Sequence, residues 1–143
     1  MLTKDLTDHC TLFRGLTTER AAELLETYGY ALRIYPPHSF PAMQGDACRA
    51  LLIVCRGRVN AWMAGEGGKQ IIVEQFTDWD VLAPAFLMAT RNVYPVSVET
   101  TTDCELLVIH RETLLRMLHA DMRMMENYLR EISDKCLALT QRI

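Results

Sequence analysis

The sequence has no long apolar run, no signal peptide and no basic stripe. A membrane-spanning helix needs about 20 mainly apolar residues, and no stretch of this chain approaches that length. Residues 1–5 lack the basic and apolar regions of a signal peptide. The net charge is −3 and the basic residues are dispersed, which argues against a nucleic-acid surface on this segment. We therefore expect a cytoplasmic protein that touches neither membranes nor DNA through these residues.

The patterns that bind metals or carry catalysis are also missing. No two cysteines form a C-x-x-C pair, which removes the usual local signal for a zinc or iron–sulfur site. There is no His-x-His pair for a metal-dependent enzyme and no Gly-rich phosphate loop. Haem is not expected either, because His38 lies in a Pro-Pro turn, His110 at a strand end, and methionine is a common core filler. We predict no cofactor, no metal and no enzyme activity.

The five cysteines are scattered and odd in number, which in a reducing compartment predicts free thiols. Most of them are expected to act as small buried apolar groups. They are Cys10, Cys48, Cys55, Cys104 and Cys136.

What the chain does have suits one globular domain: 143 residues, of which 50% are hydrophobic and 23% charged. The first thirty residues are predicted to be helical, with one clear helix over about 18–28. Thr17 or Thr18 can cap its start, and Gly29 can end it. Its apolar residues recur at helical spacing, namely Ala21, Leu24, Leu25 and Tyr28.

From residue 31 to residue 109 the pattern changes to short apolar stretches separated by turn residues. These stretches are rich in valine, isoleucine, leucine and aromatic residues and predict strands at 51–55, 59–64, 71–76, 93–99 and 105–109. The glycines of segment 65–68 predict a hairpin turn, because glycine permits positive φ. Many short strands at such intervals predict a sandwich, barrel or roll.

The C-terminal part is predicted to be helical again, with a short helix over about 111–118 and a break at 119–121. Asp121 can cap a last helix that runs to the final residue. Along that helix apolar residues alternate in spacing between 3 and 4, which is typical of a coiled-coil seam. The seam residues are Met122, Met125, Leu129, Ile132, Cys136, Leu139 and Ile143.

We predict that this seam faces an identical helix in a homodimer. A second apolar patch with Met124 and Tyr128, and with Leu137 nearby, is predicted to face the β-structure. The alternative is one helix that packs only on its own domain. Such a helix usually carries one broad stripe with a period near 3.6, so the narrow seam favours the dimer.

The order of these parts resembles the effector domain of the Crp/Fnr family of bacterial transcription regulators. Seven segments carry the resemblance: LFRGL at 12–16, QGD at 44–46, LIVCRGRV at 52–59, GKQ at 68–70, DVL at 80–82, SVET at 97–100 and CELLVIHR at 104–111. The resemblance implies a mainly β fold with flanking helices, a double-stranded β-helix of the jelly-roll type, and a long C-terminal dimerisation helix.

The domain boundaries implied are 1–120 for the β-roll effector domain with its N-terminal helices and 121–143 for the dimerisation helix. The family implies that DNA is read by a helix-turn-helix, which we expect beyond the end of this chain. The alternative is a stand-alone regulatory or protein-interaction module without DNA binding. A helix-turn-helix encoded after Ile143 would distinguish the two.

The family's cyclic-nucleotide cassette uses a Gly-Glu pair and a later arginine, which bind the ribose and the cyclic phosphate. Here those positions read Ala83-Pro84 and Tyr94, so tight binding of cyclic AMP is not expected. Arg91 could reach the site in principle, although a loop arginine is usually solvated. We predict an apolar pocket that takes an uncharged or hydrophobic effector, or none. Its residues are Leu82, Ala83, Pro84, Ala85, Phe86, Arg91, Tyr94, Val96 and Ser97.

Overall fold

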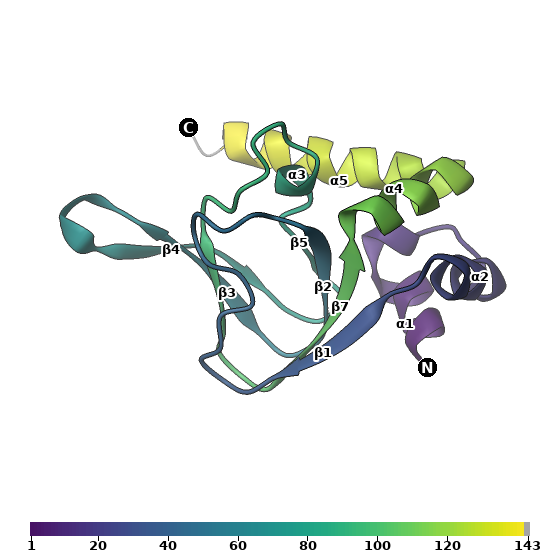
Figure 1. Cartoon of the computed structure of the whole chain (residues 1–143), viewed down its shortest axis with the longest axis horizontal. Coiled ribbons are helices and arrows are strands. Elements are labelled where there is room, and N and C mark those ends of the chain that lie inside the picture. Colours follow the sequence, from purple (N-terminus) through teal and green to yellow (C-terminus); the bar gives the residue numbers. More distant parts are fainter. Residues whose placement is uncertain (142–143) are drawn as a thin grey trace.

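The computed structural model describes residues 1–141, so the predicted seam residue Ile143 lies outside the described residues. Two antiparallel sheets face each other in a β-roll (Figure 1). The four-stranded sheet has the order β1 (Ala31–Tyr35), β7 (Cys104–His110), β2 (Ala50–Arg56) and β5 (Val81–Leu82). The three-stranded sheet has the order β4 (Gln70–Phe76), β3 (Val59–Ala64) and β6 (Ser97–Thr100).

The roll is held together by apolar side chains between the sheets. Residues 51–55 of β2 are buried throughout, because this central strand is covered on both faces. Val59 and Ala61 of β3 are buried while Asn60 between them is more exposed, the alternation expected of a strand with one covered face. The predicted mainly β jelly-roll with flanking helices and a long C-terminal helix is confirmed.

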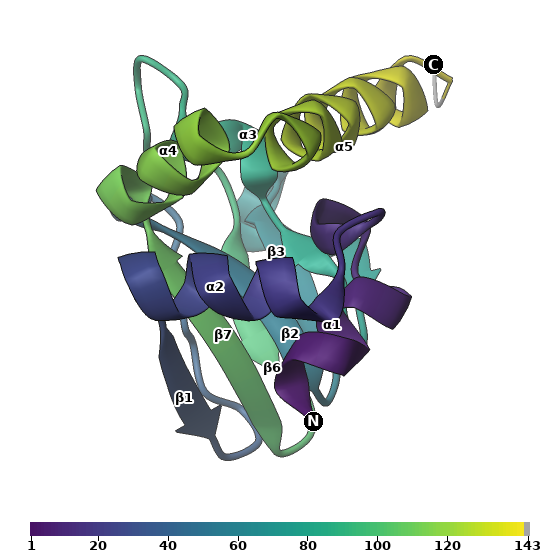
Figure 2. The ribbon, with the colours of Figure 1, turned by 90° about the vertical axis from the view of Figure 1, so that its right-hand side faces the viewer.

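The N-terminal helices cover the outer face of the four-stranded sheet. They are α1 (Leu2–His9), a short 3-10 turn η1 (Thr11–Phe13) and α2 (Thr18–Tyr28), which Figure 2 shows lying across β7 and β2. Thr17 is the cap of α2, since its hydroxyl oxygen accepts from the N–H of Arg20 at 3.0 Å. Gly29 ends the helix with φ 99°, a conformation that favours glycine. Both ends of α2 therefore lie where the sequence predicted them.

Two further helices follow the last strand. Helix α4 (Arg111–Ala120) continues to Ala120, so the predicted end at residue 118 was too early. Asp121 then adopts an extended conformation, and its Oδ1 accepts from the N–H of Met124 at 2.9 Å, which confirms it as the cap of α5 (Met122–Gln141). Its Oδ2 accepts from Arg20 Nε at 2.9 Å, so the same carboxylate ties α2 to the junction of α4 and α5.

Some predicted boundaries were wrong. The stretch 93–99 forms a strand only from Ser97 onward, and Val93 makes a single bridge with Ala47. Strands β1 and β5 and the short helix α3 (Pro84–Leu87) were not predicted at all. The hairpin turn at 65–68 is confirmed between β3 and β4, and it uses positive φ at Gly67 and Gly68.

The cysteine prediction is confirmed: all five thiols are free, four are buried, and only Cys136 on α5 is exposed. Within residues 1–141, no helix combines the length and apolar character required to span a membrane.

Candidate functional site

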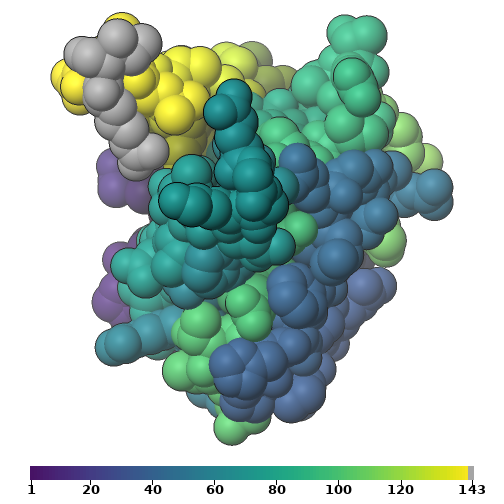
Figure 3. Space-filling model, turned by 90° about the vertical axis from the view of Figure 1, so that its left-hand side faces the viewer, coloured from purple at the N-terminus to yellow at the C-terminus, as the bar shows by residue number. Residues whose placement is uncertain are grey.

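A cavity of about 410 Å³ lies between the C-terminal half of α5 and the three-stranded sheet, a size typical of small-molecule sites. Figure 3 views the molecule from this side, with the yellow end of α5 above the teal hairpin of β3 and β4. Strands β3, β4 and β6 form one wall, segments 82–86 and 95–96 another, and α5 covers the space. The lining residues are Ala61, Met63, Val73, Glu74, Phe76, Leu82, Ala83, Pro84, Ala85, Phe86, Pro95, Val96, Val98, Lys135, Cys136, Ala138 and Leu139.

The charges on this lining neutralise each other. Among the described lining residues only Glu74 and Lys135 are charged, and Lys135 Nζ lies 2.6 Å from Glu74 Oε2. The same ammonium lies 5.2 Å from the centre of the Phe76 ring, within reach of a cation–π contact. Within the part of the lining that the structure describes, the one cation therefore already has a carboxylate partner.

The segment that leads into α3 has an unusual backbone. Ala83 lies in the left-handed region with φ 47° and ψ 48°, which costs about 1–2 kcal/mol for a residue other than glycine. Pro84 follows at the start of α3, where its missing N–H leaves no hydrogen bond unmade. At the other end of α3, Arg111 Nε donates to the carbonyl oxygen of Leu87 at 3.2 Å. These contacts fix the wall that runs over residues 82–87.

Helix α5 is anchored mainly by its first half. The buried Asn127 donates through Nδ2 to the carbonyl oxygens of Leu12 at 2.9 Å and Arg14 at 2.8 Å. The buried Tyr128 hydroxyl donates to the carbonyl oxygen of Pro84, and burial raises the pKa of Tyr128 to about 12. In the second half of the described helix, Lys135 forms an ion pair with Glu74 of the roll. The part of α5 that covers the cavity is thus the more weakly held part.

Six of the nine pocket residues predicted from the sequence line this cavity: Leu82, Ala83, Pro84, Ala85, Phe86 and Val96. The other three do not. Arg91 is exposed in a turn, and Tyr94 is buried elsewhere, beside the Cys48 thiol. Ser97 Oγ accepts from the N–H of Gln44 at 2.9 Å.

Sequence reasoning missed the strand residues of the cavity, such as Met63, Val73 and Phe76. Alternation along β3 and β4 could have placed these side chains on one face of a sheet, but not opposite the last helix. It also missed that two predicted seam residues, Cys136 and Leu139, line the cavity.

The predicted seam lies largely on the exposed side of α5. Met122, Leu129 and Leu139 are 71%, 55% and 60% exposed, and Cys136 is exposed as well. Two other seam residues, Met125 and Ile132, are partly buried against the core. Of the second patch, Met124 and Tyr128 are buried against the body of the domain as predicted, whereas Leu137, which lies near this patch along the sequence, is 57% exposed.

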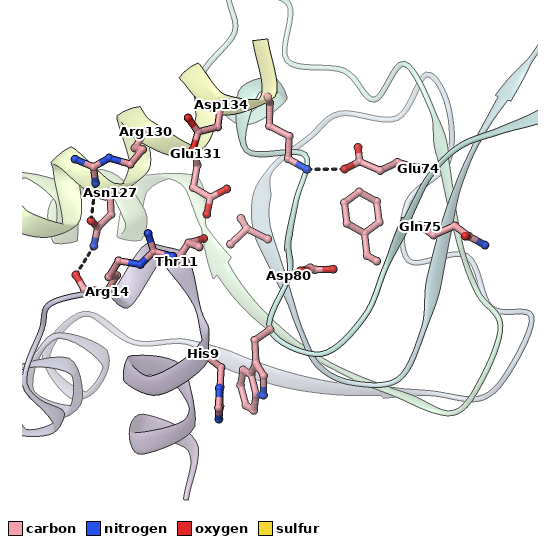
Figure 4. A pocket seen from close by; sticks show the side chains of 14 residues that line it. His9, Thr11, Arg14, Glu74, Gln75, Asp80, Asn127, Arg130, Glu131 and Asp134 are labelled. Atoms are coloured by element: carbon pink, nitrogen blue, oxygen red, sulfur yellow. Dashed lines mark hydrogen bonds and ion pairs between the residues drawn. The ribbon is translucent and has the colours of Figure 1, made fainter. Parts of the chain in front are cut away.

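A second, polar cavity of about 280 Å³ lies beside the first and shares Glu74, Phe76 and Lys135 with it. Figure 4 shows its labelled side chains coming from α1, η1, strand β4 and α5, together with Arg14 just after η1 and Asp80 just before β5. Burial, together with the charge of Asp134, raises the pKa of Glu131 above its usual value, although Lys135 opposes this shift. Both basic and acidic side chains line this cavity, so its lining does not favour a ligand of one particular charge.

The described residues contain no group of three His, Cys, Asp or Glu side chains placed to hold a metal ion. Burial raises the pKa of the Cys10 thiol to about 12 and that of Cys55 to about 11, so both thiols stay protonated near neutral pH.

Comparison with known proteins points to one family. The model of the family described as "Cyclic nucleotide-binding domain" matches residues 32–121. No curated protein matches the chain.

Solved structures share the fold. The catabolite activator protein of Thermus thermophilus superposes with a TM-score of 0.83 at 22% identity, over 92% of this chain and 61% of that one. The chain therefore spans 61% of the length of that protein. The sensor domain of the transcriptional regulator DNR from Pseudomonas aeruginosa gives a TM-score of 0.81 at 19% identity, over 99% of this chain and 93% of that one. A cyclic nucleotide-binding domain from Methylobacillus flagellatus KT gives a TM-score of 0.80 at 13% identity, over 99% of this chain and 79% of that one.

Proposed function

The chain belongs to the cyclic nucleotide-binding domain family, and we propose that it is the effector-sensing and dimerisation domain of a Crp/Fnr-type transcription regulator that does not respond to cyclic nucleotides. The transcription regulators among its structural neighbours support the regulatory part of this proposal. In such a protein the DNA would be read by a further domain joined to the dimerisation helix. A regulator of this kind acts in the cytoplasm, where bacterial DNA lies.

The chemistry of the cavity carries the proposal that the effector is not a cyclic nucleotide. A cyclic phosphate needs a cation and N–H donors that face it, since a buried anion without partners costs several kcal/mol. At the cassette positions this chain has Ala83, Pro84 and Tyr94, and Pro84 has no N–H to donate. The nearby ammonium of Lys135 is already bound to Glu74 at 2.6 Å.

The exposed seam on α5 supports the dimerisation part. Leu129 and Leu139 leave large apolar surface in water, and burying such side chains contributes roughly 1.5–3 kcal/mol each. Two copies of one helix can bury the same stripe against itself about a two-fold axis. The buried face with Met124 and Tyr128 meanwhile holds each helix on its own roll.

Isothermal titration of the purified chain with cyclic AMP and cyclic GMP tests the proposal. We expect no binding up to millimolar ligand. As a comparison, a variant that combines Ala83→Gly and Pro84→Glu supplies the Gly-Glu pair in the cavity wall, whereas Tyr94 is left unchanged because its side chain lies outside the cavity beside Cys48. This variant should also fail to bind, because the described lining still offers no cation beyond the paired Lys135. Micromolar affinity of the unmodified chain for either nucleotide would contradict the proposal.

A further inference from the structure

We infer that the cavity beneath α5 binds an uncharged, largely apolar small molecule that contacts the helix directly at Cys136 and Leu139. This inference rests on the proposed function, because it names the effector class of the same site. The cavity has walls from both sheet and helix, and its lining is mainly aliphatic and aromatic.

Charge excludes an ionic ligand from this space. A charged group that leaves water needs an opposite charge in the site, or it loses several kcal/mol of solvation. The lining carries one carboxylate and one ammonium within the described residues, and the 2.6 Å contact between Glu74 and Lys135 uses both. An anion that drew Lys135 away would leave Glu74 without its partner, and a cation would do the same to Lys135.

Hydrogen bonding excludes a ligand rich in hydroxyl groups. The carbonyl oxygen of Pro84 accepts from Tyr128, and that of Ala83 accepts from the N–H of Phe86 at 3.2 Å. A sugar that entered the cavity would exchange water for walls with few free donors or acceptors, and each unmade bond costs about 1–3 kcal/mol. Apolar groups gain by the same transfer, since their burial contributes about 25 cal/mol per Å².

The size of the cavity favours a small molecule over a second copy of the chain. The volume of about 410 Å³ lies within the range of small-molecule sites, about 300–1,000 Å³. Small-molecule sites are concave, whereas two paired helices meet along an exposed stripe of side chains such as the predicted seam. A partner helix can therefore lie along the outer face of α5 while a ligand lies beneath the same helix.

The ligand would meet the predicted dimer seam at its far end. Cys136 and Leu139 line the cavity and also belong to the seam. A ligand that fixes these side chains changes how they are presented to a partner helix. Because coupling between two binding events is reciprocal, dimerisation would change ligand affinity by the same factor.

A pair of fluorescent probes with one ring skeleton tests the ligand class. N-phenyl-1-naphthylamine is uncharged and apolar, and 8-anilinonaphthalene-1-sulfonate adds a sulfonate to the same rings. We expect the unmodified chain to bind the uncharged probe saturably, with one probe per chain and at least tenfold tighter than the sulfonate. Equal affinity for both probes, or no saturable binding of the uncharged one, would overturn the inference.

Two pairs of variants test the location. Val73→Trp fills the cavity from β4, whereas Ile71→Trp places the same ring on the same strand outside the lining. Leu139→Glu puts a charge at the cavity, and Leu137→Glu puts it on an equally exposed part of α5 that does not line it. We expect at least a tenfold loss of probe affinity in the first member of each pair only. Equal affinities within both pairs of folded variants would place the probe elsewhere and sink the inference.

Failure of this inference is distinguishable from failure of the proposed function. The Val73→Trp chain keeps its entire seam, so sedimentation should still find a dimer while probe binding is lost. A dimer that binds neither cyclic nucleotides nor the uncharged probe would contradict only the inference that the cavity takes an uncharged, apolar ligand. A monomer that binds the uncharged probe at this cavity would contradict only the dimer.

Discussion

The hydroxyl of Tyr128 on α5 donates a hydrogen bond to the carbonyl oxygen of Pro84 at the start of α3, and both groups are buried. This bond joins the predicted dimerisation helix to the wall of the cavity. A movement of segment 83–87 would therefore act directly on Tyr128, in the well-anchored half of the helix.

Tyr128→Phe should lower the free energy of unfolding by about 1–2 kcal/mol, because the buried carbonyl oxygen of Pro84 loses its donor. Urea denaturation followed by circular dichroism measures the change. Tyr30→Phe is the control, since the Tyr30 side chain is 43% exposed and its loss of a hydroxyl should change little. Equal effects of the two substitutions would show that the Tyr128–Pro84 bond contributes nothing to stability.

Stability should fall on the alkaline side as buried groups ionise. Burial raises the pKa of Cys10 from 9.0 to about 12 and that of Tyr128 from 10.0 to about 12. The folded chain holds these protons more tightly than the unfolded chain does. The contribution of these two protonated groups to the free energy of unfolding is therefore complete below pH 9 and is lost as the pH rises toward 12.

Cys10→Ala should therefore flatten the decline in the free energy of unfolding between pH 9 and pH 12. Leu6→Ala, which removes buried apolar packing but no ionisable group, should leave the slope unchanged. The slope is the readout, because Cys10→Ala also removes packing at every pH. Identical slopes for Cys10→Ala and the unmodified chain would refute the assignment.

Leu129→Glu should convert a dimer to a monomer in sedimentation equilibrium, because it places a charge in the predicted seam. Leu137→Glu is a close control: Leu137 lies off the seam and is 57% exposed, against 55% for Leu129. We expect a loss of dimer affinity of at least tenfold for the first variant and almost none for the second. The seam is wrong if both variants, or neither, dissociate the dimer.

Cys136 should cross-link to its own counterpart in a second chain. In a parallel pair of helices the same seam position faces itself across the two-fold axis. The other four thiols are buried, so a short bismaleimide should give one covalent dimer band on a denaturing gel. Cys136→Ser should abolish the band, and a band that persists in this variant would place the contact elsewhere.

The sequence predicted most of what local chemistry decides. Thr17 and Asp121 act as helix caps because their oxygens reach N–H groups only three residues away. The hairpin at 65–68 follows from glycines at positive φ. Such features depend on neighbours in the chain, and the pattern of residues records them directly.

The main error in the β-region arose because residues that are buried in a loop were predicted to form a strand. Tyr94 and Val96 are buried, and this apolar character suggested a strand from residue 93. They lie instead in a loop that precedes β6. Strand β1 was missed although Leu32 and Ile34 alternate with Arg33. It is a short edge strand, and these two apolar side chains are exposed instead of buried in the core.

The site depends on contacts that no local pattern records. Lys135 and its partner Glu74 are 61 residues apart in the sequence, and Asn127 and its partner Leu12 are 115 residues apart. Which charge neutralises which, and how large a space remains beneath α5, is decided only when the sheets and helices have packed. The apolar character of segment 82–86 could be predicted from the sequence. The residues of β3, β4 and α5 that line the same cavity could not.

Asp121 gives the last helix a fixed pivot, because its two carboxylate oxygens hold the first turn of α5 and the guanidinium of Arg20. Asn127 and Tyr128 extend this anchoring, so the free lever arm begins after Tyr128 and grows by about 1.5 Å per residue. A bend of roughly 10° just after Tyr128 would leave the anchored half in place and carry the end of the described helix sideways by about 3 Å. Small rearrangements near the anchored half of α5 are thus converted into larger displacements at the other end of the described helix.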